Sequence, residues 1–181
     1  MKNITKPYIQ NKQIENFVNI KRVNHLNELK LLNLPKDQFV IVSSGVMSLF
    51  GIRENDDIDI SVTKKLFWYV LKQSKFHMQF YKKADENSFF PSNYPICRFF
   101  DGSVEIGFRT FTAPIQNLID SAYNIDGYNF LNFERLIQWK LAINRPKDIN
   151  DIKLIQNFCN KHNIQISPVK KLLSSKYNKI F

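Results

Sequence analysis

The sequence predicts one α+β domain (α/β with a mixed sheet in its core) with a helical C-terminal region, and three observations support this. Its 181 residues suit a single domain. Short apolar, β-branched runs such as Phe39–Ser43 alternate with short helical patterns in the first two thirds of the chain. The last third has the apolar spacing of amphipathic helices over Leu131–Ile143 and Lys147–His162. We therefore expect the strands to precede the longest helices.

The N-terminal residues are expected to form a helical segment. Apolar residues recur there at helical spacing, with a possible break between Asn19 and Asn24. Leu34-Pro35 ends the segment, because the residue before a proline avoids the α region. The chain is thus divided into a helical segment over 1–37, an α/β core over 38–130, and C-terminal helices packed on the core over 131–181.

The core is expected to begin with a buried strand and to end with a hairpin. Asp101-Gly102 suits the tight primed turn of that hairpin. Ser167-Pro168 would open a third C-terminal helix, with serine as its cap. The core elements expected in order are a strand at Phe39–Ser43, helix Val46–Phe50, strand Asp57–Val62, helix Lys64–Ser74, strand Phe76–Tyr81 and the hairpin of Ile96–Phe100 with Val104–Phe108.

Composition narrows the functional classes. The most apolar stretch is interrupted by serines, and the first residues have no signal-peptide core, so we expect a cytoplasmic protein with no membrane partner. Cys97 and Cys159 are too few and too far apart for a disulfide framework or a thiolate zinc site. The net charge of +10 favours polyanionic partners, although codon usage in an AT-rich genome would also enrich lysine.

Two carboxylates stand on one face of the expected strand Asp57–Val62. Alternate strand residues point to opposite faces, so Asp57 and Asp59 share the face opposite the apolar residues. Two carboxylates this close repel each other, so the pair would not be expected if it served stability alone. A divalent cation between them would turn the repulsion into attraction, although a solvent-exposed strand face also accounts for the pattern.

Glu105 repeats this arrangement in the strand Val104–Phe108. If the two strands are neighbours, Asp57, Asp59 and Glu105 converge as a cluster of hard oxygen donors, which suits Mg²⁺ or Mn²⁺ better than zinc. Such a cluster is typical of two-metal phosphoryl chemistry.

The turn after the first strand is a candidate phosphate site. Ser43, Ser44 and Gly45 lie between that strand and a short helix, where exposed backbone N–H groups can bind phosphate oxygens. An ordinary helix cap explains the same residues.

In this order, the three features resemble the polymerase β-like nucleotidyltransferase superfamily. The pattern is a small-residue turn, an aspartate strand of the Asp57-Ile58-Asp59-Ile60 type, and a later carboxylate strand. Small, uncharacterised bacterial members are similar also around Gly51-Ile52-Arg53 and from Trp139 to Asp151. The resemblance covers roughly residues 38–162 and implies a palm-like core, catalytic and metal-binding roles for Asp57, Asp59 and Glu105, and Mg²⁺ or Mn²⁺ as cofactor.

The turn departs from the superfamily pattern. The family has glycine followed by glycine or serine, whereas this chain has Ser43-Ser44 before Gly45. Serine lacks the freedom of glycine at positive φ. Either Gly45 takes the role one residue later, or the phosphate cradle is altered.

Further basic residues are candidates for the triphosphate. Lys140 lies on the inward edge of its helix, where it either snorkels or faces the carboxylates. We expect Arg145 and Arg53 to contact phosphate, and Asp151 to orient Arg145 or Lys140.

The expected function is transfer of a nucleoside monophosphate from an NTP, such as ATP, to RNA, a protein or a small molecule. The alternative is a catalytically silent member of the same fold that binds RNA or a toxin–antitoxin-type partner. The sequence does not identify the base, the acceptor or the oligomeric state.

Overall fold

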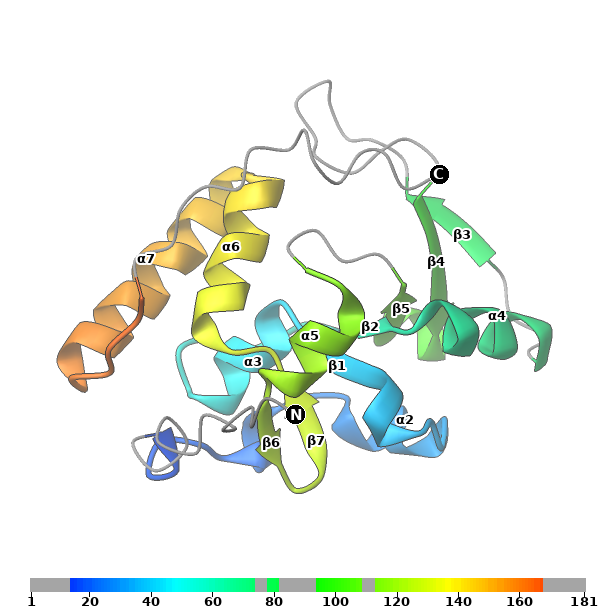
Figure 1. Ribbon diagram of the computed structural model, residues 1–181, viewed down its shortest axis with the longest axis horizontal. Helices are drawn as coiled ribbons and strands as arrows, with labels where there is room; N and C mark the ends of the chain where they lie inside the picture. The colour runs from blue at the N-terminus through cyan, green and yellow to red at the C-terminus, as the bar shows by residue number, and fades with distance from the viewer. Residues whose placement is uncertain (1–13, 74–77, 82–93, 109–112, 168–181) are drawn as a thin grey trace, which may run out of the picture.

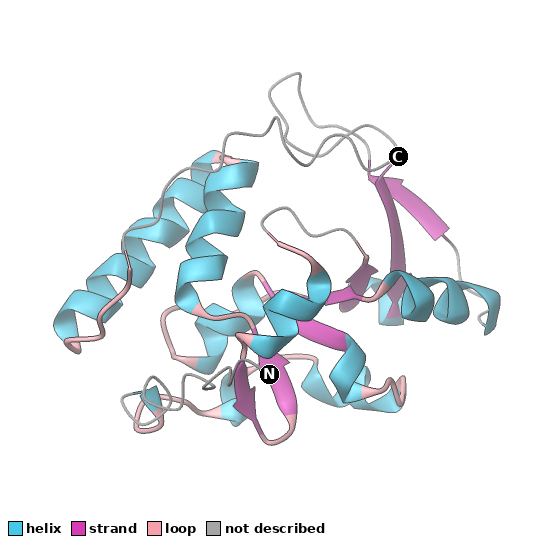
Figure 2. Cartoon of the chain, in the orientation of Figure 1, coloured by secondary structure: helices cyan, strands magenta, loops and turns pink. Residues whose placement is uncertain are grey.

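The computed structural model describes residues 14–73, 78–81, 94–108 and 113–167, and it has the expected α+β architecture (Figures 1 and 2). The described strands form one seven-stranded mixed sheet in the order β3-β4-β5-β2-β1-β7-β6. β2 runs parallel to β5 and β1 parallel to β7, while the other neighbours are antiparallel. The strands are β1 (Phe39–Val42), β2 (Ile58–Val62), β3 (Met78–Tyr81), β4 (Tyr94–Phe99), β5 (Val104–Gly107), β6 (Tyr123–Ile125) and β7 (Tyr128–Phe130).

Helices pack around this sheet, and the two longest lie side by side at one end of the molecule (Figure 1). These two, α6 and α7, form a helical hairpin, and α4 lies beyond β5 toward the other end of the view. The helices are α2 (Leu26–Leu31), α3 (Ser44–Leu49), α4 (Lys64–Gln73), α5 (Ile115–Asp120), α6 (Phe133–Ile143) and α7 (Pro146–Lys161), with short 3-10 helices η1 (Ile20–Arg22), η2 (Lys36–Gln38) and η3 (Phe100–Gly102).

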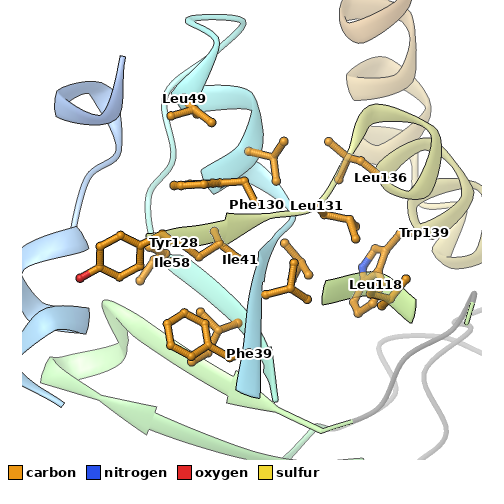
Figure 3. Close-up of a cluster of buried hydrophobic side chains, with 14 of the residues drawn as sticks. Phe39, Ile41, Leu49, Ile58, Leu118, Tyr128, Phe130, Leu131, Leu136 and Trp139 are labelled. Carbon is orange, nitrogen blue, oxygen red and sulfur yellow. The ribbon is translucent and has the colours of Figure 1, made fainter. Parts of the chain in front are cut away.

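The core lies where α3, α5 and α6 meet the central strands (Figure 3). All four residues of β1 are buried, which is why this strand is apolar on both faces. Ile41 and Phe130, which are paired across β1 and β7, lie in this core with Leu136 of α6. The apolar run at Phe39–Val42 thus places β1 at the centre of the fold, and the turn that follows it leads straight to the candidate site.

Most expected elements are confirmed within one or two residues. The N-terminal break is confirmed, because η1 and α2 are separate and His25 between them has φ of 62°. The Asp101-Gly102 turn is also confirmed, since both residues have positive φ and Ser103 N–H donates to the Phe100 carbonyl at 3.1 Å. The turn lies in a four-residue loop, because the strand pairing stops at Phe99 and Val104.

The segment around 113–130 was missed. It forms α5 and the β6–β7 hairpin, whose turn residues Asp126 and Gly127 have φ of 51° and 76°. That Asp-Gly turn is the same hairpin signal as at Asp101-Gly102. The expected third C-terminal helix falls outside the described residues, apart from Ser167.

No helix in the described ranges combines the length and the apolar character that crossing a bilayer requires. Cys97 and Cys159 are both buried free thiols.

Candidate functional site

A pocket of about 340 Å³ lies between the central strands and the hairpin of α6 and α7. Nine of the ten residues predicted from the sequence line it, and Gly45 does not. On the sheet side are Asp57, Asp59 and Glu105, which we call the acidic row, together with Ser43 and Ser44. On the helix side are Arg53, Lys140, Arg145 and Asp151, together with Asp148; we call these five the buried charge network.

Strand register explains the acidic row. Asp59 of β2 is paired with Glu105 of the parallel neighbour β5, so the two side chains share one face. Asp57 comes one residue before β2 begins and also lines the pocket. The prediction that the two carboxylate strands are neighbours in the sheet is therefore confirmed.

Asp59 is the most perturbed carboxylate in the row. Burial, followed by repulsion from Asp57 and Glu105, raises its pKa to about 7. The Ser43 hydroxyl, which donates a hydrogen bond to Asp59, and the nearby Lys147 oppose part of that rise. The row therefore holds a carboxyl group whose negative charge is poorly compensated by protein groups.

Glu105 has a partner that the sequence reasoning missed. Arg98 lies directly opposite on β4, and its Nε donates to Glu105 Oε2 at 2.9 Å. Within the described parts of the chain, no three His, Cys, Asp or Glu side chains converge closely enough to hold one metal ion. The three-carboxylate cluster is thus aligned but not closed, because Glu105 points to the guanidinium of Arg98.

Ser43 carries the backbone strain of the phosphate-type turn. Its φ of 57° and ψ of −135° lie in a region that glycine adopts easily and serine rarely does. Gly45 is buried inside α3, and a Cβ there would lie 3.0 Å from Ile41 Cγ2. Gly45 therefore serves close packing of α3 on β1, and the unusual conformation stays at Ser43 rather than moving to Gly45.

Asp151 organises one half of the buried charge network. Lys140 Nζ donates to Asp151 Oδ2 at 2.6 Å, and Lys140 is only 2% exposed. Arg53 binds the same carboxylate with two N–H groups, at 2.8 and 3.0 Å. Asp151 therefore orients Lys140, as predicted, but its second partner is Arg53 and not Arg145.

Asp148 organises the other half. Arg145 donates to it through Nε at 2.7 Å and through Nη2 at 3.1 Å, and the backbone N–H of Arg145 donates as well. The Asp148 carboxylate thus accepts from the backbone N–H of Arg145, the residue before α7, and caps the first turn of that helix. Lys140 Nζ also lies 3.8 Å from Asp148, which links the two halves.

The network keeps its charges. Burial alone would raise the pKa of Asp151, but the hydrogen bonds from Arg53 and Lys140 outweigh it and hold the carboxyl below its usual range. Burial lowers the pKa of Lys140, and the bond to Asp151 offsets part of that effect. With a hydrogen bond of 2.6 Å between them, we treat both groups as ionised. Three cations and two carboxylates leave one net positive charge on this side of the pocket.

Lys147 adds to that positive charge. It is exposed, lines the pocket near Asp59, and forms no ion pair with any described residue. A pairing between Lys147 and Asp151, four residues apart, would have been the simplest expectation, yet Asp151 is already occupied by Arg53 and Lys140.

Comparisons with known proteins add little. None of the family models matches this sequence, and no curated protein matches it either. A solved structure with some similarity is that of JHP933 from Helicobacter pylori, which is 19% identical over 76% of this chain and 68% of that chain. The TM-score is 0.39, a likeness too weak to support an argument about function.

Proposed function

We propose that this protein is a metal-dependent nucleotidyltransferase that moves a nucleoside monophosphate from an NTP to an acceptor. One observation carries the proposal: the acidic row on β2 and β5 faces the cations of α6 and α7 across a single pocket. Carboxylates opposite cations are what a metal–triphosphate complex requires, because the complex presents positive charge on one side and negative charge on the other.

The acidic row supplies the right donors for the metal. Asp57 and Asp59 would hold Mg²⁺ or Mn²⁺ through hard carboxylate oxygens, and Glu105 would join them on release from Arg98. Burial is the largest cause of the raised pKa of Asp59, and repulsion from Asp57 and Glu105 is the next. A bound metal cation would relieve that repulsion. When bound, the metal would neutralise charge that develops on the transferred phosphoryl group.

The cations across the pocket would bind the phosphates. Arg53 and Arg145 are each held in place by a carboxylate and remain partly exposed, so they are pre-oriented rather than mobile. Lys147 is the cation that a triphosphate can engage without breaking an ion pair with a described residue. The hydroxyls of Ser43 and Ser44 would add hydrogen bonds at the sheet side of the pocket.

The proposed step is a displacement at the α-phosphorus. The acceptor hydroxyl oxygen forms the new P–O bond, the bond to the bridging oxygen of the β-phosphate breaks, and pyrophosphate leaves with that electron pair. The proton of the hydroxyl passes to a carboxylate, for which Glu105, at the edge of the row, is the candidate.

Calorimetric titration with each of the four NTPs, with and without Mg²⁺ or Mn²⁺, tests this proposal. We expect metal-dependent binding that Asp59→Asn abolishes and Asp101→Asn leaves intact, since Asp101 lies exposed in the β4–β5 turn. An α-labelled NTP incubated with RNA, protein and small-molecule fractions then identifies the acceptor. Full transfer by the Asp59→Asn variant would contradict the assignment.

The Arg98–Glu105 pair favours a second candidate, a catalytically silent module of the same fold. If Arg98 holds Glu105 permanently, the third carboxylate never reaches the metal. This candidate predicts no NTP binding at millimolar Mn²⁺, and no gain of binding in Arg98→Met. Metal-dependent NTP binding by the wild type rejects it.

A further inference from the structure

Helix α4 presents an outward face that the candidate site does not use. Lys64, Lys65, Trp68, Tyr69 and Lys72 are all exposed, and Trp68 and Tyr69 are 42% and 57% exposed. At 100° per residue these positions fall within one side of the helix. Three lysines therefore surround two exposed aromatic rings on one continuous face.

The opposite side of α4 fixes this orientation. Leu66, Phe67 and Val70 are buried in the core, so the helix cannot rotate to hide its aromatic residues. Trp68 also packs against two other rings, since its ring centroid lies 5.7 Å from that of Phe67 and 6.5 Å from that of Phe108. Its exposed part is thus held in place before any ligand arrives.

The face has the chemistry of a nucleic-acid platform. α4 contains no acidic residue, and its three lysines form no ion pair with any described residue. Ammonium groups neutralise phosphates, while exposed aromatic rings stack on unpaired bases of any sequence. We propose that this α4 face, with its three lysines around Trp68 and Tyr69, binds single-stranded nucleic acid.

A second copy of the chain fits this face less well. A symmetric contact through α4 would bring lysines against lysines with no carboxylate on the helix to pair with them. A polyanion meets the same lysines with complementary charge.

Helix α4 adjoins the end of β5, the strand that carries Glu105. Gly107 lines the pocket, and the next residue, Phe108, packs against Phe67 and Trp68 of α4. The binding proposal does not depend on the proposed transferase activity, and it would hold for a silent module as well.

Fluorescence anisotropy with a labelled single-stranded RNA of about 12 nucleotides tests the proposal on the full chain. We expect the logarithm of the affinity to fall with the logarithm of salt concentration with a slope of about −2 or steeper, given three lysine contacts. Trp68 emission should be quenched on binding, and Trp68→Phe should remove that signal.

Substitutions on α4 have matched controls elsewhere. Changing Lys64, Lys65 and Lys72 together to glutamate should reduce the salt slope by about 2, whereas the same change at the exposed Lys30, Lys153 and Lys161 alters net charge equally and should have a much smaller effect. Tyr69→Ala should weaken binding on the order of tenfold, while Tyr69→Phe should retain it because the ring is kept. Circular dichroism confirms that each variant is folded.

Three results would each overturn the proposal. Equal losses in the α4 and control triple variants would show that only net charge matters. Duplex bound as tightly as single strand, with no effect of Tyr69→Ala, would remove the stacking role. Self-association that depends on Tyr69, in a protein that binds no RNA at low salt, would make α4 a protein interface.

Discussion

The charged residues on the two sides of the pocket differ in how completely they are paired. In the buried charge network every carboxylate has a close cation, and Asp151 receives hydrogen bonds from both Lys140 and Arg53. In the acidic row Asp59 lies near two other carboxylates, and the strained Ser43 donates a hydrogen bond to it. The carboxylates of the buried charge network are thus neutralised by protein cations, whereas the acidic row has room for an added cation.

The difference suggests two roles: the buried charge network positions its arginines, and the acidic row binds a cation. A complete network holds Arg53 and Arg145 at defined places, and each of its members depends on the others. An incomplete row costs stability in the absence of a cation, which a fold tolerates where function requires it. The comparison predicts opposite effects for the same kind of substitution on the two sides.

The largest effect is expected for Asp151→Asn. The change leaves the Lys140 ammonium and the Arg53 guanidinium facing a neutral amide in a buried place. Removing one partner of a buried pair costs about 3–5 kcal/mol of unfolding free energy. Urea denaturation measures it, with the exposed Asp101→Asn as a control expected to change stability by no more than about 0.5 kcal/mol. A loss similar to that of the control would mean that the network is not structural.

Asp59→Asn is expected to do the opposite, with a stabilising effect that grows as pH rises from about 4 to 7 and persists above. Its pKa of about 7 in the folded protein lies above the usual value of about 3.9 in an unfolded chain. The contribution of Asp59 to the free energy of unfolding is therefore fully present below about pH 4 and is lost as pH rises to 7, while asparagine does not titrate. The variant should match the wild type at pH 4.

At pH 8 we expect the free energy of unfolding of the Asp59→Asn variant to exceed that of the wild type by about 2 kcal/mol. This is about half of what the whole pKa shift would give, because water in the pocket screens the charge of Asp59. Denaturation at both pH values in the presence of a chelator measures this. A difference that is independent of pH would show that the row does not destabilise the folded protein.

Ser43 is expected to give the smallest effect, and its sign depends on the replacement. Ser43→Gly relieves the strain of a φ of 57°, and after the loss of the hydrogen bond to Asp59 we expect a gain of about 1 kcal/mol. Ser43→Ala loses the same hydroxyl but keeps the strain, so it should be no more stable than the wild type. Thermal melts of the two variants compare them, and equal melting temperatures would argue against strain at this turn.

Local pattern alone was sufficient to predict the acidic row. Period-2 alternation around Asp57, Asp59 and Glu105 placed the carboxylates on one face, and strand pairing then brought the two strands together as expected. Arg98 could also have been found. With Asp101-Gly102 as the turn, counting back along the hairpin pairs Arg98 with Glu105, and the structure has that register.

The sequence by itself determined the α+β class, the strand that carries Asp59 with Asp57 just before it, and the helices that carry Lys140 and Asp151, because these depend on the spacing of apolar residues along the chain. Only the tertiary structure decided the ion pairs. Arg53 reaches Asp151 across 98 residues of sequence, and no local pattern encodes which cation fills a carboxylate. The strain at Ser43 was decided in the same way, because the packing of Gly45 on Ile41 fixes where the turn must bend.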